Sequence, residues 1–402
     1  MTVSEFIKKY ALAPEEIDGP ACLRDLLLQM ERGLAGEGNI PMIPSYLSLE
    51  IRPATGKPCC VMDAGGTNLR AAQAVFSEDG TCKLSRLSKT AMPGTQGELS
   101  FDAFYKALAA YARGTEAAEQ VGLCFSYNVM LERDLDGILD SWCKEVRVPE
   151  APGKPVGSSL QTAIGADCRS VRVLNDSTAA LLGGRIADPE VSVGLIMGTG
   201  INICYSEACS RIPKVPSDLR SDSMIISTEI GEFDGFPKTV FDTQVIETSG
   251  EPALAHAEKQ CAGAYLGDLI SLAWQAAVRE QLLDKPFDKV WSLPEISDYL
   301  AEKTTAIPEN PVAKEIARTM LHRAAKIAAV LTAGPILRSC PAGKSMAMII
   351  EGSQFQKLTG FGARFQKELD ALLTPHRIGW RVVQQENSCL LGAALAAFAE
   401  PM

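Results

Sequence analysis

The sequence predicts an α/β protein in which two related domains face a shared cleft. The chain has 402 residues, which is room for about two domains at roughly 100–200 residues each. A strand, a glycine-rich turn and a second strand occur twice, as VMDAGGTNLRAAQAVF from Val61 and as VGLIMGTGINICYSE from Val193. The copies are only loosely similar. Taken at face value, they predict two related domains, each with one glycine turn directed at the cleft.

Apolar periodicity and turn residues define the elements of the first half. Residues 4–34 have the spacing of helices, and a connector broken by prolines follows at 39–58. The pair Asp79 and Gly80 marks a turn between two of the next strands. We expect strands at 59–66, 69–77, 81–88, 120–128 and 171–176, and helices near 100–113, 156–166 and 177–185.

The second half continues the alternation of strands and helices. The second glycine turn lies inside 191–207, and helical patterns dominate from about 255 to 340. A strand at 345–353 then leads into a helix, and a further strand follows at 377–385. A last apolar helix is expected at 390–399.

Composition excludes several classes of function. The net charge is −10 and the pI about 5.1, which argues against a nucleic-acid partner because phosphate backbones are bound by clustered Lys and Arg. The 12 cysteines form no C-x-x-C pair and the three histidines lie far apart, so we expect no zinc site and reduced thiols in a cytoplasmic protein. No apolar signal core opens the chain, and the longest apolar run, 327–337, is too short to span a membrane.

Two common nucleotide motifs are absent. The segment PAGKS at 341–345 resembles the end of a P-loop, but the pattern G-x-x-x-x-G-K-[ST] requires glycine where Arg338 stands. No G-x-G-x-x-G opens a helix after a strand, so a Rossmann dinucleotide site has no support.

The two glycine turns are the remaining candidates for a phosphate site. Such a turn exposes several backbone N–H groups and lets a large anion approach closely, and each copy also carries a threonine. An ordinary hairpin turn is the alternative for either copy taken alone. Asp63 at the strand end would repel phosphate unless a cation lies between them, so we predict that it holds Mg²⁺ through water. The candidate phosphate-binding residues are Gly65, Gly66, Thr67, Asn68, Arg70, Gly198, Thr199 and Gly200.

A candidate general base lies between the turns. In VRVLNDSTAALLGG, Asn175 and Asp176 stand where a strand gives way to a helix. Helix capping would explain them without any function, because these residue types are preferred at helix N-termini. The functional interpretation is that Asp176 accepts a hydroxyl proton during phosphoryl transfer, a reaction that otherwise needs positioning and electrostatic stabilisation.

Recognition of a sugar would need amides and carboxylates in rigid positions, since each sugar hydroxyl both donates and accepts. Any one of the acidic residues, viewed singly, is more simply explained as a surface residue, and sequence spacing alone does not bring the set together. The candidates are Ser126, Lys144, Asn175, Asn202, Glu229 and Glu258.

From about residue 56 to the end, the sequence resembles the hexokinase family, ATP-dependent hexose kinases of the actin-like ATPase superfamily. Nine segments carry the resemblance in the family's order, and a helical N-terminal extension is also expected. They are VMDAGGTNLR, LCFSYNV, SWCKEV with PVGSSLQTAI, VLNDSTAALL, GLIMGTGINICYSE, STEIGEFDG, AEKQCAGAYLGDL, IIEGSQF and ENSCLLGAALAA.

The resemblance implies a two-lobed actin-like (ribonuclease H-like) ATPase fold with duplicated mixed sheets, flanking helices and a central cleft. It implies that 1–55 pack on the large lobe, that 56–175 and 388–402 form the small lobe, and that 176–387 form the large lobe. It implies transfer of the γ-phosphate of MgATP to the 6-hydroxyl of a hexose such as glucose, with Asp176 as base, the six sugar contacts above and further ATP contacts at Gly352 and Ser353. Mg²⁺ would be held mainly by the ATP phosphates, and the enzyme would be a monomer or homodimer.

The sequence departs from the family pattern at several positions. Asn128 replaces a proline, Cys143 replaces a threonine and Glu351 replaces an aspartate, while Ser388 and Leu390 replace glycines. These changes leave open which sugar and nucleotide are preferred. Two other functions remain as alternatives: a hexose-binding regulator without catalysis, and an actin-like or chaperone-type ATPase without a sugar substrate.

Overall fold

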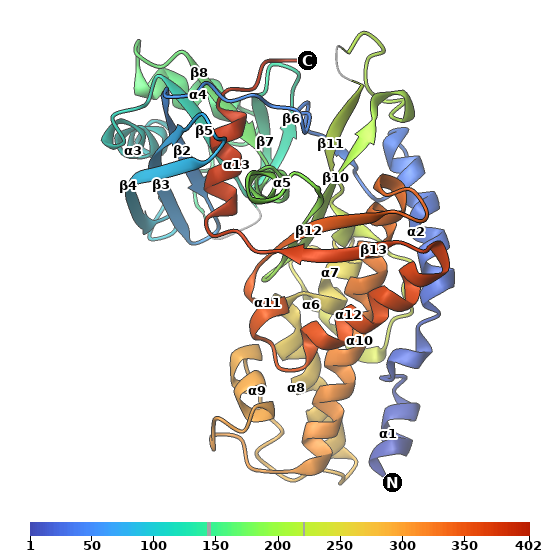
Figure 1. The fold of residues 1–402 in the computed structure, drawn as a ribbon. Helices are drawn as coiled ribbons and strands as arrows, with labels where there is room; N and C mark the ends of the chain where they lie inside the picture. Colours follow the sequence, from blue (N-terminus) through green and yellow to red (C-terminus); the bar gives the residue numbers. More distant parts are fainter. Residues whose placement is uncertain (143–145, 220–221) are drawn as a thin grey trace.

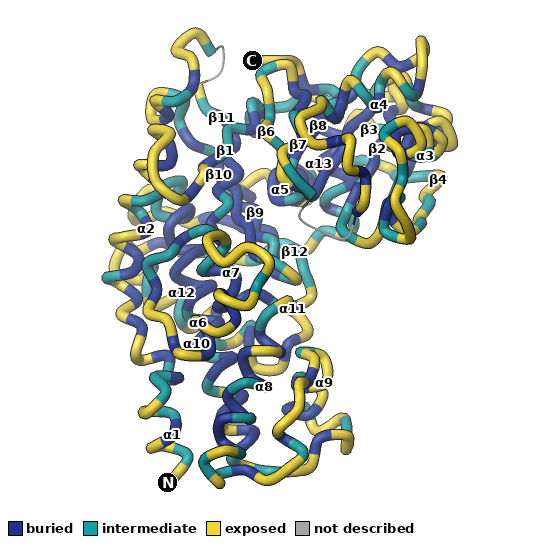
Figure 2. The backbone as a smooth tube through the Cα atoms, turned by 180° about the vertical axis from the view of Figure 1, so that it is seen from behind, coloured by how far each residue is buried: buried dark blue, intermediate teal, exposed yellow. Residues whose placement is uncertain are grey.

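The protein has two lobes, each built around a mixed β-sheet with helices on its faces (Figure 1). The computed structural model describes residues 1–142, 146–219 and 222–402. Among these residues, no helix is both long and apolar enough to cross a lipid bilayer. The buried residues lie in the sheets and in the helices against them, whereas the loops are mostly exposed (Figure 2).

The first sheet has the strand order β4-β3-β2-β5-β8. The three strands β4, β3 and β2 pair antiparallel, and β5 and β8 continue the sheet in parallel. The register aligns Asp63 on β2 with Arg70 on β3. The bounds are Pro58–Ala64 for β2, Asn68–Phe76 for β3, Cys82–Ala91 for β4, Gln120–Phe125 for β5 and Ser170–Leu174 for β8.

The second sheet repeats this pattern of directions in the order β1-β11-β10-β9-β12-β13. Strands β11, β10 and β9 are antiparallel, and β12 and β13 then add in parallel, so the predicted duplication is confirmed. The bounds are Ile43–Pro44 for β1, Val191–Met197 for β9, Ile201–Ala208 for β10, Ser223–Ser227 for β11, Ser345–Glu351 for β12 and Gly379–Val383 for β13.

Two predicted elements differ from the structure. The expected helical stretch 4–34 is divided into α1 (Val3–Lys9) and α2 (Gly19–Leu34), because Pro14 opens a short 3₁₀ turn and Asp18 caps a new helix. The expected strand 120–128 ends at Phe125, and a separate hairpin of β6 (Asn128–Leu131) and β7 (Gly137–Ser141) follows.

The remaining helices cover the sheets and extend the lower lobe (Figure 1). Helix α10 is the central helix of that lobe, and most of its residues are buried. The bounds are Phe101–Gly114 for α3, Val156–Ile164 for α4, Asp176–Ala187 for α5, Val240–Thr248 for α6, His256–Cys261 for α7, Gly263–Arg279 for α8, Leu293–Leu300 for α9, Pro311–Ser339 for α10, Ser353–Lys357 for α11, Phe361–Leu373 for α12 and Ser388–Ala396 for α13.

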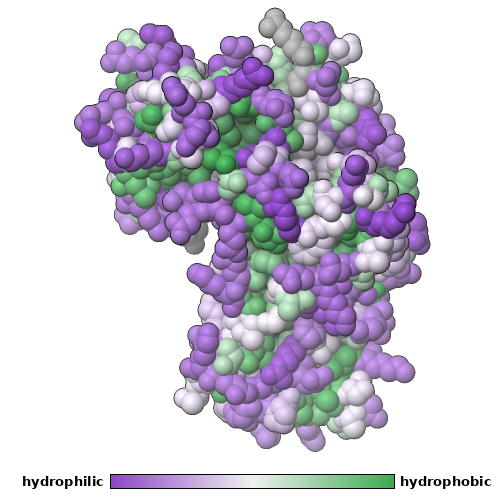
Figure 3. Space-filling model, in the orientation of Figure 1, coloured by the Kyte–Doolittle hydropathy of each residue, from purple (hydrophilic) through white to green (hydrophobic). Residues whose placement is uncertain are grey.

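Helices α5 and α13 cross where the lobes meet. Glycines allow their backbones to touch: a Cβ on Gly183 would lie 2.0 Å from the Ser388 carbonyl oxygen, and one on Gly392 would lie 1.8 Å from that of Ala179. Apolar residues gather at this junction on the face shown in Figure 3. The close packing fixes the first turn of α5, which carries Asp176.

Candidate active site

The first turn of α5 presents Asn175 and Asp176 at the carboxyl end of β8. Asn175 is the N-cap: its Oδ1 accepts hydrogen bonds from the backbone N and the Oγ of Ser177, both at 2.8 Å. Asp176 is the first residue of the helix, and its Oδ1 accepts from the Ser177 N–H at 2.8 Å. Capping is therefore performed by Asn175, while the carboxylate of Asp176 lies at the positive end of the α5 dipole.

A second wall of the site comes from β10, β11 and the residues that follow β11. The Asn202 side chain binds Glu229 twice: its Nδ2 donates to Glu229 Oε1 at 2.5 Å, and its Oδ1 accepts from the Glu229 N–H at 3.0 Å. Glu229 has a left-handed backbone conformation, with φ of 53°, which this pair of bonds supports. Glu229 is thus part of a hydrogen-bonded cluster and is not an isolated surface acid.

Glu258 on α7 completes a group of three carboxylates. Its Oε2 accepts from the Ile201 N–H at 2.9 Å, directly after the second glycine turn. A Cβ on Gly200 would lie only 2.5 Å from this Oε2, so a side chain there would displace the carboxylate. Burial, with further contributions from Asp176 and Glu258, raises the pKa of Glu229 to about 7. The structure therefore brings Asn175, Asp176, Asn202, Glu229 and Glu258 together from four segments of the chain.

The segment after β5 connects this site to the first glycine turn. The Ser126 N–H donates to the Ala64 carbonyl at 3.2 Å, and the Tyr127 hydroxyl donates to the Gly65 carbonyl at 2.8 Å. The Tyr127 ring packs edge-on against Trp142, with centroids 5.0 Å apart. Lys144, the remaining sugar candidate, lies outside the described residues.

The first glycine turn is fixed by an ion pair. Arg70 donates to Asp63 Oδ2 through Nη2 at 2.5 Å and through Nε at 2.9 Å. Its Nη1 donates to Asn387 Oδ1 at 3.2 Å, just before α13 begins. Arg70 therefore places a positive charge beside Asp63, and the predicted contact of Asp63 with Mg²⁺ through water stays a prediction. Thr67 and Asn68 are exposed at the tip of the turn.

The second glycine turn is surrounded by backbone. The N–H groups of Gly263 and Ala264 at the start of α8 donate to the carbonyls of Gly198 and Thr199, at 2.8 and 3.0 Å. Gly352 has φ of 111°, and a Cβ there would lie 2.2 Å from the Met197 carbonyl oxygen. The turn, the start of α8 and the residues Gly352 and Ser353 therefore meet in one place.

This arrangement fits a polyphosphate. Backbone N–H groups, glycines and helix N-termini are features that bind phosphate oxygens. Among the described residues, no group of three or more His, Cys, Asp and Glu side chains could hold a metal ion.

Three residues of the site were not predicted from the sequence. Gly263 lies in the quoted segment AEKQCAGAYLGDL, but it was not singled out as a site residue. Asn387, which binds Arg70 from 317 positions away, gave no local signal. Ser227 also gave none, although its hydroxyl lies among Ser177, Asn202 and Glu229.

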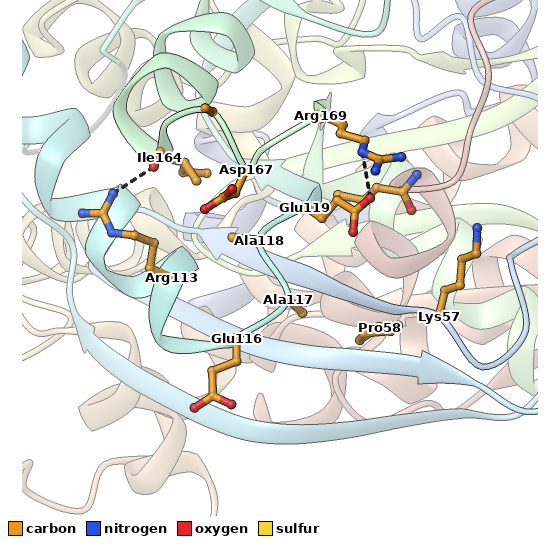
Figure 4. A pocket seen from close by; sticks show the side chains of 12 residues that line it. Lys57, Pro58, Arg113, Glu116, Ala117, Ala118, Glu119, Ile164, Asp167 and Arg169 are labelled. Carbon is orange, nitrogen blue, oxygen red and sulfur yellow. Dashed lines mark hydrogen bonds and ion pairs between the residues drawn. The ribbon is translucent and has the colours of Figure 1, made fainter.

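A hollow of about 720 Å³ lies elsewhere, at the amino ends of β2, β5 and β8 (Figure 4). Its wall includes Lys57, Arg113 and Asp167, together with the ion pair of Arg169 and Glu119 at 2.8 Å. Ligands of open α/β sheets bind at the carboxyl ends of the strands, where Asp63, Ser126 and Asp176 lie. This hollow is therefore not the site described above.

Comparison with known proteins agrees with this geometry. Two family models, both described as hexokinase, match residues 2–186 and 192–399. The chain belongs to the hexokinase family. Hexokinase-2 of Candida albicans is 29% identical over 87% of this chain and 81% of its own length. As a member of this family, the protein is an ATP-dependent hexose kinase, which uses MgATP to phosphorylate a sugar.

Solved structures show the same fold. The hexokinase of Schistosoma mansoni in complex with glucose superposes with a TM-score of 0.80 at 21% identity, over 99% of this chain and all of that one. A glucokinase of the ROK family from Streptomyces griseus, in complex with glucose and AMPPNP, reaches 0.52 at 19% identity over 84% of this chain and 98% of its own. The two-lobed actin-like ATPase fold expected for a hexokinase is confirmed.

Proposed function

We propose that this hexokinase transfers the γ-phosphate of MgATP to the 6-hydroxyl of glucose, with Asp176 as the general base. The observation that carries the proposal is the convergence of Asp176, Glu229 and Glu258 beside the second glycine turn. One carboxylate serves as base, and the other two accept hydrogen bonds from sugar hydroxyls. That glucose is bound in the Schistosoma mansoni structure supports the choice of sugar.

Hydrogen bonds within the protein hold the sugar wall, which is formed by Asn202, Glu229 and Glu258. Asn202 holds Glu229 by two hydrogen bonds, and Ile201 holds Glu258. Asn175, Ser126 and Lys144 are the further sugar contacts in this proposal. Fixed acceptors orient the 6-hydroxyl towards Asp176, which takes its proton as the oxygen attacks the γ-phosphate.

The phosphates of ATP bind between the two glycine turns. Residues 65–68 and 198–200, with Gly352 and Ser353, supply backbone N–H groups and hydroxyls, and Arg70 supplies positive charge. Mg²⁺ would enter the site bound to the ATP phosphates and would offset their negative charge in the transition state. Asp63 acts by orienting Arg70, and it reaches the metal only through water.

We propose lobe boundaries that follow these contacts. Residues 56–175 form the small lobe, and α13 within 388–402 completes it by packing on β2 and β5. Residues 176–387 form the large lobe, and 1–55 pack on that lobe through α2 against α10 and β1 against β11. Closure of the lobes over sugar excludes water as a competing phosphate acceptor.

The compartment and assembly are also part of the proposal. All 11 cysteines among the described residues are free, which suits the reducing cytoplasm. We propose a monomer or homodimer, which light scattering on the purified chain distinguishes.

A coupled ADP-release assay with MgATP tests the function directly. Glucose, mannose, fructose, glucosamine and N-acetylglucosamine are compared at equal concentrations, with ATP alone as the blank. We expect the highest kcat/KM with glucose and almost no ADP in the blank. ADP release that is independent of sugar would contradict the proposal in favour of a chaperone-type ATPase. Sugar binding without ADP release would favour a regulator.

A further inference from the structure

Ser227, the last residue of β11, lies between the two walls of the site. It is 1% exposed, and its Oγ has three polar neighbours from three elements. These are Ser177 Oγ at 3.4 Å, Asn202 Nδ2 at 3.1 Å and Glu229 Oε1 at 3.1 Å. A buried hydroxyl with these neighbours connects the N-terminal cap of α5 to the sugar wall.

The hydroxyl and amide hydrogens available show which atom donates in each of these hydrogen bonds. The Ser177 hydroxyl donates to Asn175 Oδ1 at 2.8 Å. The Asn202 amide donates one hydrogen to Glu229 Oε1 and the other to Ser227 Oγ. The single hydroxyl proton of Ser227 therefore goes to Glu229 Oε1, and the 3.4 Å contact with Ser177 is left without a hydrogen.

We propose that Ser227 is a positioning residue for sugar recognition, whose hydroxyl keeps the Glu229 carboxylate ionised and aimed into the cleft. This inference rests on the proposed sugar site. Ser227 touches no substrate in the proposal, and it acts only through Glu229 and Asn202. Loss of its hydroxyl would remove one of the two side-chain donors on Glu229 Oε1.

The electrostatic setting makes Glu229 sensitive to this donor. Among the described residues, the charged groups that act on its carboxyl are Asp176 from α5 and Glu258 from α7, and both are negative. Together with burial they raise its pKa to about 7, and the hydrogen bonds from Ser227 and Asn202 oppose that rise. Loss of one of these donors therefore raises the pKa of Glu229 further and favours the protonated carboxyl.

Protonation of Glu229 also reverses the direction of the contacts. A protonated carboxyl donates to Ser227 Oγ, and the Ser227 hydroxyl proton then turns to Ser177 Oγ at 3.4 Å. Protonation of Glu229 therefore changes the hydrogen bonding of Ser177, which lies at the N-terminal cap of α5 next to Asp176.

Steady-state kinetics of Ser227→Ala with glucose, between pH 5.5 and 9, test the inference. In the wild type we expect KM for glucose to rise as the pH falls through about 7. In Ser227→Ala this rise begins about one pH unit higher, and KM at pH 7 increases about fivefold while kcat stays within about twofold. Ser227→Thr, which keeps the hydroxyl, restores most of the wild-type pH profile.

Thr228→Ala provides the structural comparison. Thr228 is fully buried and its Oγ1 donates to the Ile203 carbonyl at 2.6 Å, so this variant also loses a buried hydroxyl but no contact with Glu229. We expect a similar fall in Tm and an unchanged pH profile of KM. An unshifted profile in Ser227→Ala, or an equal shift in Thr228→Ala, would overturn the inference.

Glu229→Ala separates this inference from the site on which it rests. If Glu229→Ala raises KM strongly and Ser227→Ala does not, the role of Ser227 is wrong and the sugar site stands. If neither variant changes KM, the sugar site is itself wrong.

Discussion

The two glycine turns end equivalent strands of equivalent sheets, yet they are held in place differently. The turn at 65–67 depends on side chains, since Arg70 on the neighbouring strand binds Asp63 and Asn387. A Cβ on Gly65 would have the Asn68 carbonyl oxygen at 3.4 Å as its nearest neighbour. The Met92 N–H also donates to the Thr67 carbonyl at 2.9 Å. This turn thus has space around it, and its support includes an ion pair.

The turn at 198–200 depends on backbone contacts. The start of α8 donates two N–H groups to it, and Gly352 lies against Met197 with no room for a side chain. The two copies of the duplicated hairpin are thus stabilised by different contacts, and different mutations should disrupt them. Substitution of a glycine should damage the large-lobe turn, and removal of charge should damage the small-lobe turn.

Among substitutions at the two turns, the largest effect is expected at Gly352. In Gly352→Ala the new Cβ would lie 2.2 Å from the Met197 carbonyl oxygen, so the turn at 198–200 must shift. A shift of about 1 Å at a phosphate site can lower activity by about 100-fold, and we expect kcat/KM for ATP to fall by that order. Gly360→Ala is the control, because Gly360 also has positive φ, 78°, but a Cβ there has nothing within 4 Å. Equal losses in both variants would show that backbone strain alone is responsible.

A smaller effect is expected at Gly200, compared with Gly65. The Cβ of Gly200→Ala would lie 2.5 Å from Glu258 Oε2 and would displace that carboxylate. We expect KM for glucose to rise about tenfold, the scale of one lost hydrogen bond to a charged group. Gly65→Ala should change KM for glucose by less than about threefold. If steady-state kinetics showed the reverse order, the contrast between the turns would be wrong.

Charge removal should affect the small-lobe turn. Arg70→Ala leaves Asp63 without its partner next to the phosphates, and we expect KM for ATP to rise roughly tenfold. Asp63→Asn should have a smaller effect, and adding it to Arg70→Ala should cause no further loss, because the two residues act as one unit. A double-mutant cycle on KM for ATP measures this coupling. Additive effects would mean that Asp63 contacts the nucleotide or its metal independently of Arg70.

The smallest effect is expected on thermal stability, from the titration of Glu229. Its pKa is raised to about 7 in the folded protein, from a reference value of 4.5. The folded state therefore holds a proton that the unfolded state releases, and stability falls as the pH rises from about 4.5 to about 7. Glu229→Gln removes this penalty, so its Tm relative to wild type should be a few degrees higher at pH 8 than at pH 5. Calorimetry at the two pH values measures the difference, and an equal offset at both would contradict the assignment.

The sequence was most informative where structure is local. Both turns and the first turn of α5 could be predicted, because a strand, its turn and the next element are adjacent in the chain. The residues that contact these turns from distant parts of the chain could not be predicted. Asn202 and Glu229 meet through the pairing of β10 with β11, and Arg70 meets Asn387 only because α13 returns to the first sheet. The ion pair of Asp63 with Arg70 was also not predicted, since the pairing of these residues across β2 and β3 is a property of register.

The division of 4–34 into α1 and α2 was missed although its signals were local. Pro14 and the N-cap Asp18 both lie inside the stretch 4–34, which was predicted as helical without an internal boundary. Helical periodicity on either side obscured them. The hairpin of β6 and β7 was missed because Asn128 looked like the end of the preceding strand.

The central claim is that Asp176, between the two turns, is the general base. The direct measurement is kcat of Asp176→Asn in the ADP-release assay, together with the Kd of glucose from calorimetry on the same sample. The account predicts that kcat falls by roughly 10²–10⁴-fold while the Kd of glucose changes by less than about threefold. Near-normal kcat in a variant that binds glucose normally would contradict it.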